Sequence, residues 1–191
     1  MNAYLTTPLI FLIKTLLGAY VVLVLLRFLL QWLRADFHNP LSQFVVKLTS
    51  PALHPLRRVI PGWRGLDLAA LALAWLLKTL ELTLLALLLG YGFKPLAALL
   101  WTLPALLGTL LDLFLFAVLI RVLLSWIHPD PYHPAMSVLA RLTEPLLLPA
   151  RRKLPPIGGI DLSPLAVLIV LTLIEMLLVP PLLALTRSPA F

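Results

Sequence analysis

The sequence contains no cysteine among its 191 residues, and only 12% of its residues are charged. The absence of cysteine excludes disulfides, cysteine-ligated metals and covalently attached c-type haem. A soluble globular domain carries about a quarter charged residues, so the shortage of charge argues against that class. Hydrophobic residues make up 61% of the chain, and its mean hydropathy is +1.03. This composition indicates a membrane protein.

One string of residues occurs twice in the chain. The spacing R-x4-W-x7-P-x7-L-T-x-P-x3-P-x-R-R-x2-P-x5-D begins at Arg27 and again at Arg121, 94 residues later, without an insertion. So many proline, tryptophan and charged matches at one offset, in a leucine-rich sequence, indicate a tandem duplication. We therefore divide the chain into a first repeat, residues 1–94, and a second repeat, residues 95–191.

Four apolar stretches are long enough to cross a bilayer. They cover about residues 9–33, 67–90, 97–127 and 161–185. A hydrocarbon core of about 30 Å requires about 20 helical residues, and lipid favours helices because their backbone groups pair internally. The predicted fold is an all-α membrane protein of four transmembrane helices, arranged as two tandem, parallel-repeat hairpins. Gly18 and Gly108 lie inside these stretches and are expected at close helix contacts.

A long connection separates the two helices of each hairpin. Apolar residues recur there at helical spacing, which predicts short amphipathic helices over residues 40–49 and 134–143. Each is too short to span a bilayer and is expected to lie in the membrane interface. Thr49 and Thr143 should end these helices, because prolines follow and disfavour helical backbone before them.

Lysine and arginine are concentrated in the two long connections. Residues 34–65 contain five of them and residues 128–159 contain four, whereas the middle loop and the C-terminal tail contain only Lys94 and Arg187. The positive-inside rule then places both connections in the cytoplasm and both termini outside.

Two arginines and two aspartates lie near the cytoplasmic ends of the spans, beside tryptophans that serve as interface anchors. They are Arg27, Asp67, Arg121 and Asp161, with Trp32 and Trp126. Each arginine lies about 7–8 Å inside the interface, five residues before its tryptophan. Structural pairs Arg27–Asp67 and Arg121–Asp161 are expected to tie each hairpin together. Alternatively, each arginine reaches lipid phosphates and each aspartate caps a helix, or the charges serve transport.

Four more charged residues lie deeper in the spans. They are Lys78, Glu81, Asp112 and Glu175. Helical rise places the three acids at one level, about 20 Å from the cytoplasmic interface. Charges at that depth are costly unless they are paired or hydrated. The four residues are expected to form a polar cluster that binds a cation or proton, or else to hold the helices together, with Lys78 neutralising one acid.

A basic segment follows each predicted amphipathic helix. It contains Arg57 and Arg58 in the first repeat, and Arg151, Arg152 and Lys153 in the second. These basic segments are expected to bind anionic lipid headgroups. The alternative is that they form a docking site for a cytoplasmic protein. No catalytic constellation, metal-ligand spacing or phosphate loop stands out, so we expect no enzyme activity, metal or cofactor. Without a basic soluble domain, we expect no nucleic-acid partner.

The second copy, with RVLLSWIHPD and LTEPLLLPARRKLPPIGGIDLSPL, resembles the signature of the YggT family, which includes the YlmG-like proteins. The resemblance covers the whole chain, in a two-repeat form. It implies a small, non-enzymatic protein of the bacterial inner membrane. Members have been linked to osmotic or ion stress, to cell division or nucleoid organisation, and to assembly of photosynthetic complexes. The first copy departs from the signature at Ser50, which stands where the second copy has Glu144.

The leading hypothesis is a membrane organiser or partner-docking protein in envelope, division or stress physiology, acting through the two basic connections. The competing hypothesis is a small oligomeric ion or solute pathway that uses the intramembrane carboxylates. The expected partners are the lipid bilayer with its anionic headgroups, a membrane or cytoplasmic protein, and further copies of the chain.

Overall fold

A computed structural model describes residues 3–127, 133–154 and 161–189 of the chain. The described residues form six helices and no named strand: α1 (Ala3–Trp32), α2 (Pro40–Val59), α3 (Leu68–Leu88), α4 (Pro95–Ile127), α5 (Pro134–Lys153) and α6 (Ser163–Thr186). Four of these helices, α1, α3, α4 and α6, are long and apolar enough to cross a membrane. They coincide with the four predicted apolar stretches to within a few residues, except that α1 begins six residues earlier than expected.

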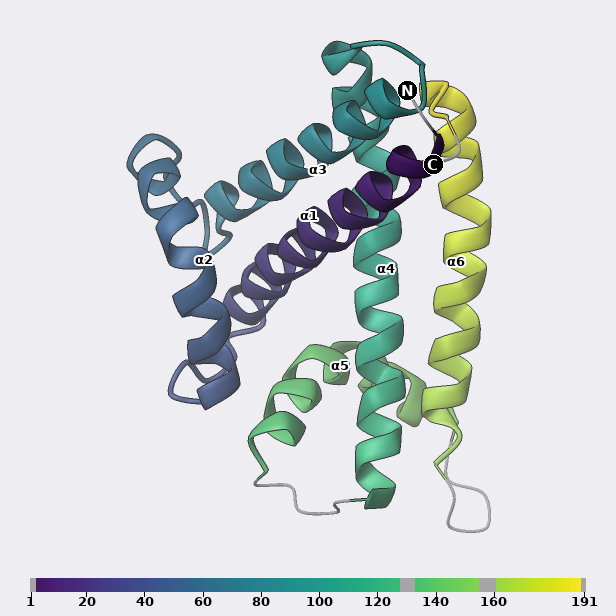
Figure 1. The fold of residues 1–191 in the computed structure, drawn as a ribbon. Coiled ribbons are helices and arrows are strands. Elements are labelled where there is room, and N and C mark those ends of the chain that lie inside the picture. The colour runs from purple at the N-terminus through teal and green to yellow at the C-terminus, as the bar shows by residue number, and fades with distance from the viewer. Residues whose placement is uncertain (1–2, 128–132, 155–160, 190–191) are drawn as a thin grey trace.

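The long helices lie in two pairs, one in each repeat. α1 packs along α3, α4 packs along α6, and α3 and α4 join the two pairs (Figure 1). Both termini lie at one end of the molecule, while α2 lies across the far end of the first pair and α5 across the far end of the second. We call α2 and α5 the elbow helices.

The elbow helices are twice as long as predicted. The expected ends at Thr49 and Thr143 are wrong, because α2 runs from Pro40 to Val59 and α5 from Pro134 to Lys153, each with two internal prolines. The predicted amphipathic helix and the basic segment after it are therefore one continuous helix in each repeat.

Side chains brace the turn of α2 that precedes Pro51. A proline removes one backbone hydrogen bond and crowds the carbonyl of the preceding turn. In that turn the Thr49 hydroxyl donates to the Val45 carbonyl (2.7 Å), and the Ser50 hydroxyl donates to the Val46 carbonyl (2.6 Å). The Arg27 guanidinium of α1 also donates to the Val46 carbonyl (3.0 Å). These bonds tie the turn before Pro51 to itself and to α1, so its backbone is held in helical form on the N-terminal side of the proline.

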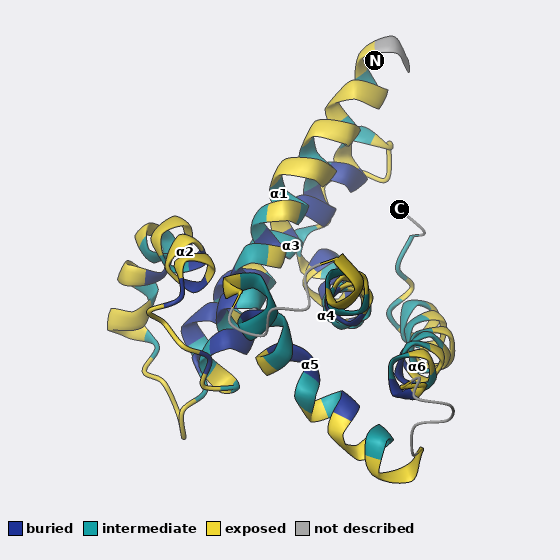
Figure 2. Cartoon of the chain, turned by 90° about the horizontal axis from the view of Figure 1, so that it is seen from below, coloured by how far each residue is buried: buried dark blue, intermediate teal, exposed yellow. Residues whose placement is uncertain are grey.

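Each elbow helix buries one face and exposes the other (Figure 2). The buried residues are Ser42, Val45, Thr49 and Leu53 on α2, and Val138, Leu142, Thr143 and Leu147 on α5. One hydrophobic cluster contains Leu29 and Leu30 of α1 together with Val45, Val138 and Leu142. The two repeats therefore share a core at the elbow end. The long helices expose large apolar side chains such as Phe11 and Leu177, as lipid-facing helices do.

Candidate functional site

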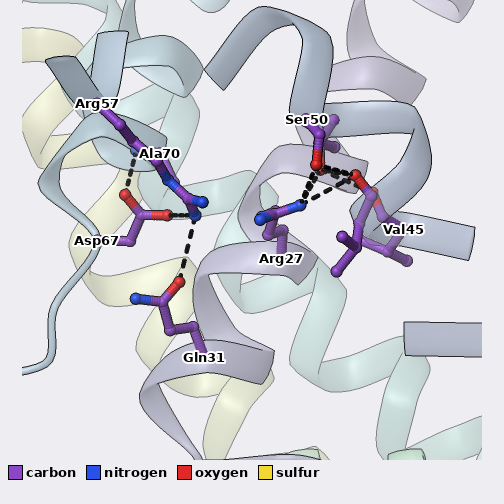
Figure 3. Close-up of polar contacts among 9 residues, drawn as sticks. Arg27, Gln31, Val45, Ser50, Arg57, Asp67 and Ala70 are labelled. Carbon is purple, nitrogen blue, oxygen red and sulfur yellow. Dashed lines mark hydrogen bonds and ion pairs between the residues drawn. The ribbon is translucent and has the colours of Figure 1, made fainter. Parts of the chain in front are cut away.

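Arg27 fastens the first long helix to its elbow helix. Its side chain leaves α1, is only 6% exposed, and points at α2 (Figure 3). One guanidinium nitrogen, Nη1, donates to the Val46 carbonyl (3.0 Å), the Thr49 hydroxyl (3.2 Å) and the Ser50 hydroxyl (3.1 Å). This contact places a cation beside the turn that precedes Pro51 and joins α1 to α2 through three acceptors.

Asp67 pairs with Arg57 and not with Arg27, so the predicted Arg27–Asp67 pair is wrong. Arg57 donates to one Asp67 carboxylate oxygen, and the other oxygen accepts from the backbone nitrogen of Ala70 (3.2 Å) in the first turn of α3 (Figure 3). Asp67 is therefore both an ion-pair partner and a helix cap. The prediction failed because it ended α2 at Thr49, whereas the continuous helix carries Arg57 to the start of α3.

The second repeat makes the same two contacts at the 94-residue offset. Arg121 donates to the Thr143 hydroxyl (2.6 Å), and Arg151 donates to the Asp161 carboxylate (2.9 Å). The predicted Arg121–Asp161 pair is therefore wrong for the reason that applies in the first repeat. Glu144 adds a bridge, because its carboxylate pairs with Arg121 (2.9 Å) and with Arg151 (3.2 Å).

The two networks differ in charge and in burial. The first contains two arginines and one aspartate, because Ser50 stands in place of the bridging glutamate, and Arg27 Nε is buried without a hydrogen-bond partner in the described part of the chain. The second is neutral, with two arginines and two acids. The Asp67 side chain is 4% exposed, whereas that of Asp161 is 40% exposed.

The pKa of Asp161 is lowered in the folded chain. Partial burial acts to raise this pKa, but hydrogen bonds from the Ser163 hydroxyl and backbone and from Arg151 outweigh the burial. Asp161 precedes α6 and holds its first turn, since the carboxylate accepts from the Ser163 backbone nitrogen at 2.9 Å. The ionised form of Asp161 is thus the form that the fold stabilises.

The basic segments contain both paired and exposed residues. Arg57 and Arg151 are engaged in the networks just described, whereas Arg58, Arg152 and Lys153 are exposed and make no ion pair within the described ranges. The tryptophans expected at the interface lie at the ends of α1 and α4. Trp32 is 54% exposed and stacks on Phe28, and Trp126 is 81% exposed.

Three of the four deeper charges converge on one cavity of about 450 Å³. Lys78 and Glu81 form an ion pair of 2.8 Å on α3, and Asp112 of α4 lines the same cavity. Glu175 is not among its lining residues, so the cluster is smaller than predicted. Lys14 of α1 lines the cavity instead, and sequence reasoning missed it.

The predicted glycine contacts are confirmed beside this cavity. A Cβ added to Gly18 would lie 4.0 Å from Glu81 Oε2, and one added to Gly108 would lie 4.0 Å from the Val179 side chain. Gly18 thus sets α1 against α3, and Gly108 sets α4 against α6. Among the described residues, no group of three His, Asp or Glu side chains is arranged to hold a metal ion.

The duplicated architecture can be compared with known proteins. The sequence model of the family described as CCB3/YggT matches residues 6–88 and again residues 100–182, which is the same 94-residue offset. The chain belongs to the CCB3/YggT family. Its two copies of the family unit therefore correspond to the two helix pairs, each with an elbow helix braced by the same arginine contacts.

Bacterial relatives resemble most of the chain, and a chloroplast relative resembles part of it. An uncharacterized protein of Pseudomonas aeruginosa is 46% identical over 187 residues, 97% of this chain and 95% of the relative. The uncharacterized protein YggT of Escherichia coli K12 is 38% identical over 168 residues, 87% of this chain and 86% of the relative. The chloroplast protein CCB3 of Arabidopsis thaliana, whose name refers to cofactor assembly of complex C, is 33% identical over 76 residues, 39% of this chain and 44% of its own. No solved structure matches the chain.

A contact between the two CCB3/YggT units was also missed by sequence reasoning. Asn39 caps α2 by accepting from the Leu41 backbone nitrogen (2.9 Å). Its amide nitrogen crosses to α5 and donates to the Pro134 carbonyl and to the Ser137 hydroxyl, both at 2.8 Å. The sequence signal was limited to a cap residue before a proline, which predicts the start of a helix but not a partner in the other unit.

Proposed function

We propose that the chain is a non-enzymatic organiser of the bacterial inner membrane that docks a protein partner on its two elbow helices. The observation that carries the proposal is the brace that both repeats share. In each, one arginine of the long helix and one of the elbow helix are fixed by hydroxyl and carboxylate groups, while further basic side chains stay exposed. A braced basic surface suits presentation to a partner, whereas catalysis requires reactive groups that converge on a substrate.

The membrane orientation follows from charge. The positive-inside rule places α2 and α5 on the cytoplasmic side, with each helix pair forming a transmembrane hairpin. The elbow helices would then lie in the interface with their basic ends at the headgroups, between the exposed anchors Trp32 and Trp126. Anionic lipids would contribute to binding there, and the partner would meet a basic surface held at a fixed height.

The name of the Arabidopsis relative supports an organising role, because that protein is named for cofactor assembly of complex C. For this chain we propose only that it takes part in assembly at a membrane. The partner's chemistry is set by the elbow helices, which offer arginine and lysine and therefore suit an acidic protein segment.

The test is a charge reversal with a matched control. A chain carrying Arg58→Glu, Arg152→Glu and Lys153→Glu is compared with one carrying Lys94→Glu, a reversal in the exposed loop at the opposite end of the molecule. Photo-crosslinkers placed on α2 and α5 in intact membranes report proximity to proteins. We expect the triple reversal to abolish a discrete crosslinked complex that Lys94→Glu retains. If both variants retain the complex, docking through the basic residues is wrong.

An ion or solute pathway is the second candidate, and the cavity that Lys78, Glu81 and Asp112 line is the observation in its favour. It would predict ion flux across liposomes that contain the purified protein, and loss of that flux in Glu81→Gln. Liposomes that show no flux at any pH would eliminate it. Charge reversal on the elbow helices should leave such flux intact, so the two candidates fail in different experiments.

A further inference from the structure

Two cavities meet on α4, where Thr109 and Asp112 line both of them. The first is the polar cavity of about 450 Å³, with Lys14, Lys78 and Glu81 in its wall. The second has a volume of about 720 Å³ and is lined almost entirely by apolar side chains of α1, α4 and both elbow helices. Both volumes fall within the range of about 300–1,000 Å³ that is usual for ligand sites.

Three charged groups in the polar cavity have hydrogen-bonding atoms without a partner. Glu81 is 4% exposed, and although Oε1 accepts from Lys78, Oε2 is buried without a hydrogen bond in the described part of the chain. Asp112 and Lys14 are exposed, and neither forms a hydrogen bond or ion pair with another described residue. A buried carboxylate oxygen without a donor, and unpaired charges at membrane depth, carry a free-energy cost that a ligand would relieve.

The balance of these charges specifies the ligand. Two lysines and two acids sum to zero, so the cavity as a whole favours neither a simple cation nor a simple anion. The two unmet acceptors, on Glu81 and Asp112, fit an ammonium group, and the unmet Lys14 fits an anionic group. A zwitterion with a primary amine supplies an ammonium for the two acceptors and an anionic group for Lys14. The adjoining apolar cavity fits a hydrocarbon chain attached to that zwitterion.

We propose that the joined cavities bind one phospholipid with an ethanolamine headgroup. Its ammonium donates to Glu81 Oε2 and to the Asp112 carboxylate, its phosphate pairs with Lys14, and one acyl chain occupies the apolar cavity. The depth agrees with this placement, because Lys14 precedes Trp32 by 18 residues. That separation is about 27 Å of helix, which brings Lys14 near the outer face of a hydrocarbon core about 30 Å thick. The headgroup would then enter from the outer leaflet, with its chain directed inward.

Lipid selectivity tests the proposal without any variant. The purified full chain is exchanged into micelles with equal amounts of phosphatidylethanolamine, phosphatidylcholine and phosphatidylglycerol of the same acyl composition, and retained lipid is measured by native mass spectrometry. Choline has the same charge as ethanolamine but no N–H to donate. We expect retention of one phosphatidylethanolamine with a preference of roughly tenfold over phosphatidylcholine, the ratio that one charge-assisted hydrogen bond supports.

Variants then locate the site. Glu81→Gln and Asp112→Asn should each reduce the preference to about threefold or less, since each weakens one acceptor for the ammonium. Glu175→Gln is the matched control. It neutralises an acid of α6 whose side chain does not line the cavity, and it should keep the tenfold preference.

Four results would overturn the proposal. Equal retention of the ethanolamine and choline lipids by the unmodified chain would show that no N–H donor of the headgroup is recognised, and would rule out the ammonium contact. Preference for phosphatidylglycerol would indicate an anion site. Equal loss of preference in Glu175→Gln would place binding elsewhere. Displacement of the lipid by chain-free glycerophosphoethanolamine at equal concentration would show that the site holds a small zwitterion and that the apolar cavity plays no part.

Discussion

Replacing Asp67 and Asp161 by asparagine, one at a time, measures what the elbow networks contribute to stability. The two residues occupy equivalent positions, and each pairs with an arginine of its elbow helix. Asparagine caps a helix about as well as aspartate, so Asp67→Asn removes the charge and leaves the cap of α3, and Asp161→Asn keeps an acceptor for the Ser163 backbone nitrogen. The environments differ, because the Asp67 side chain is 4% exposed and that of Asp161 is 40% exposed.

The expected magnitudes follow from that difference. Breaking a fully buried ion pair costs about 3–5 kcal/mol, because the remaining charge is left uncompensated. Arg57 is 38% exposed and can reach water, so we expect Asp67→Asn to lower the free energy of unfolding by about 2 kcal/mol. Arg151 is exposed to the same degree and keeps Glu144 as a partner, so Asp161→Asn should cost about 0.5 kcal/mol.

Unfolding by SDS in mixed micelles, followed by circular dichroism, measures both losses in one assay. Arg57→Met, alone and combined with Asp67→Asn, completes a double-mutant cycle that isolates the coupling between the two side chains. Equal losses for the two asparagine variants, or a larger loss for Asp161→Asn, would refute the claim that burial decides the strength of these pairs.

The same assay checks four smaller predictions. Thr49→Val removes an acceptor from a buried arginine and should cost about 1–2 kcal/mol, whereas Thr143→Val should cost about half as much, because Arg121 keeps Glu144. Ser50→Glu supplies the first network with the bridging acid that Glu144 provides in the second, and should stabilise the chain by about 1 kcal/mol. A loss of stability would mean that the first network has no room for the glutamate side chain. Asn39→Ala removes a cap and two contacts to α5, and should cost about 2 kcal/mol. The pKa of Asp161 is lowered by folding, so its stabilisation is fully present above the unfolded pKa of about 3.9 and is lost as the pH falls through the lower pKa of the folded chain. Asp161→Asn should lack that part of the pH dependence.

The spanning helices could be predicted closely because hydropathy is a local property. The stretch predicted as 67–90 is observed as Leu68–Leu88, for example. The end of α2 could not be predicted from local rules. Those rules end a helix before Pro51, whereas α2 continues to Val59 and is held against other helices by contacts such as that of Arg27 with the Val46 carbonyl. The incorrect pairing of Asp67 followed directly from that incorrect helix end.

Two features of the site required three-dimensional information. Lys14 could have been noted as a lone charge in the first apolar stretch, but nothing local indicates that it lines a cavity with Glu81 of another helix. Asn39 contacts Ser137, which is 98 residues away in the sequence. By contrast, the Lys78–Glu81 ion pair follows from the sequence alone, because residues three apart on a helix face the same side.

The prolines of the elbow helices make helix continuity depend in part on a neighbour. Without α1 packed against it, α2 lacks the Arg27 donor to the Val46 carbonyl and has only its own Thr49 and Ser50 hydroxyls to brace the turn before Pro51. In the second repeat, Arg121 donates to the Thr143 hydroxyl, which itself donates to the Leu139 carbonyl in the turn before Pro145. Each elbow helix is thus braced by a residue of the long helix that precedes it in the chain, so a misplaced long helix would leave its elbow helix without that brace.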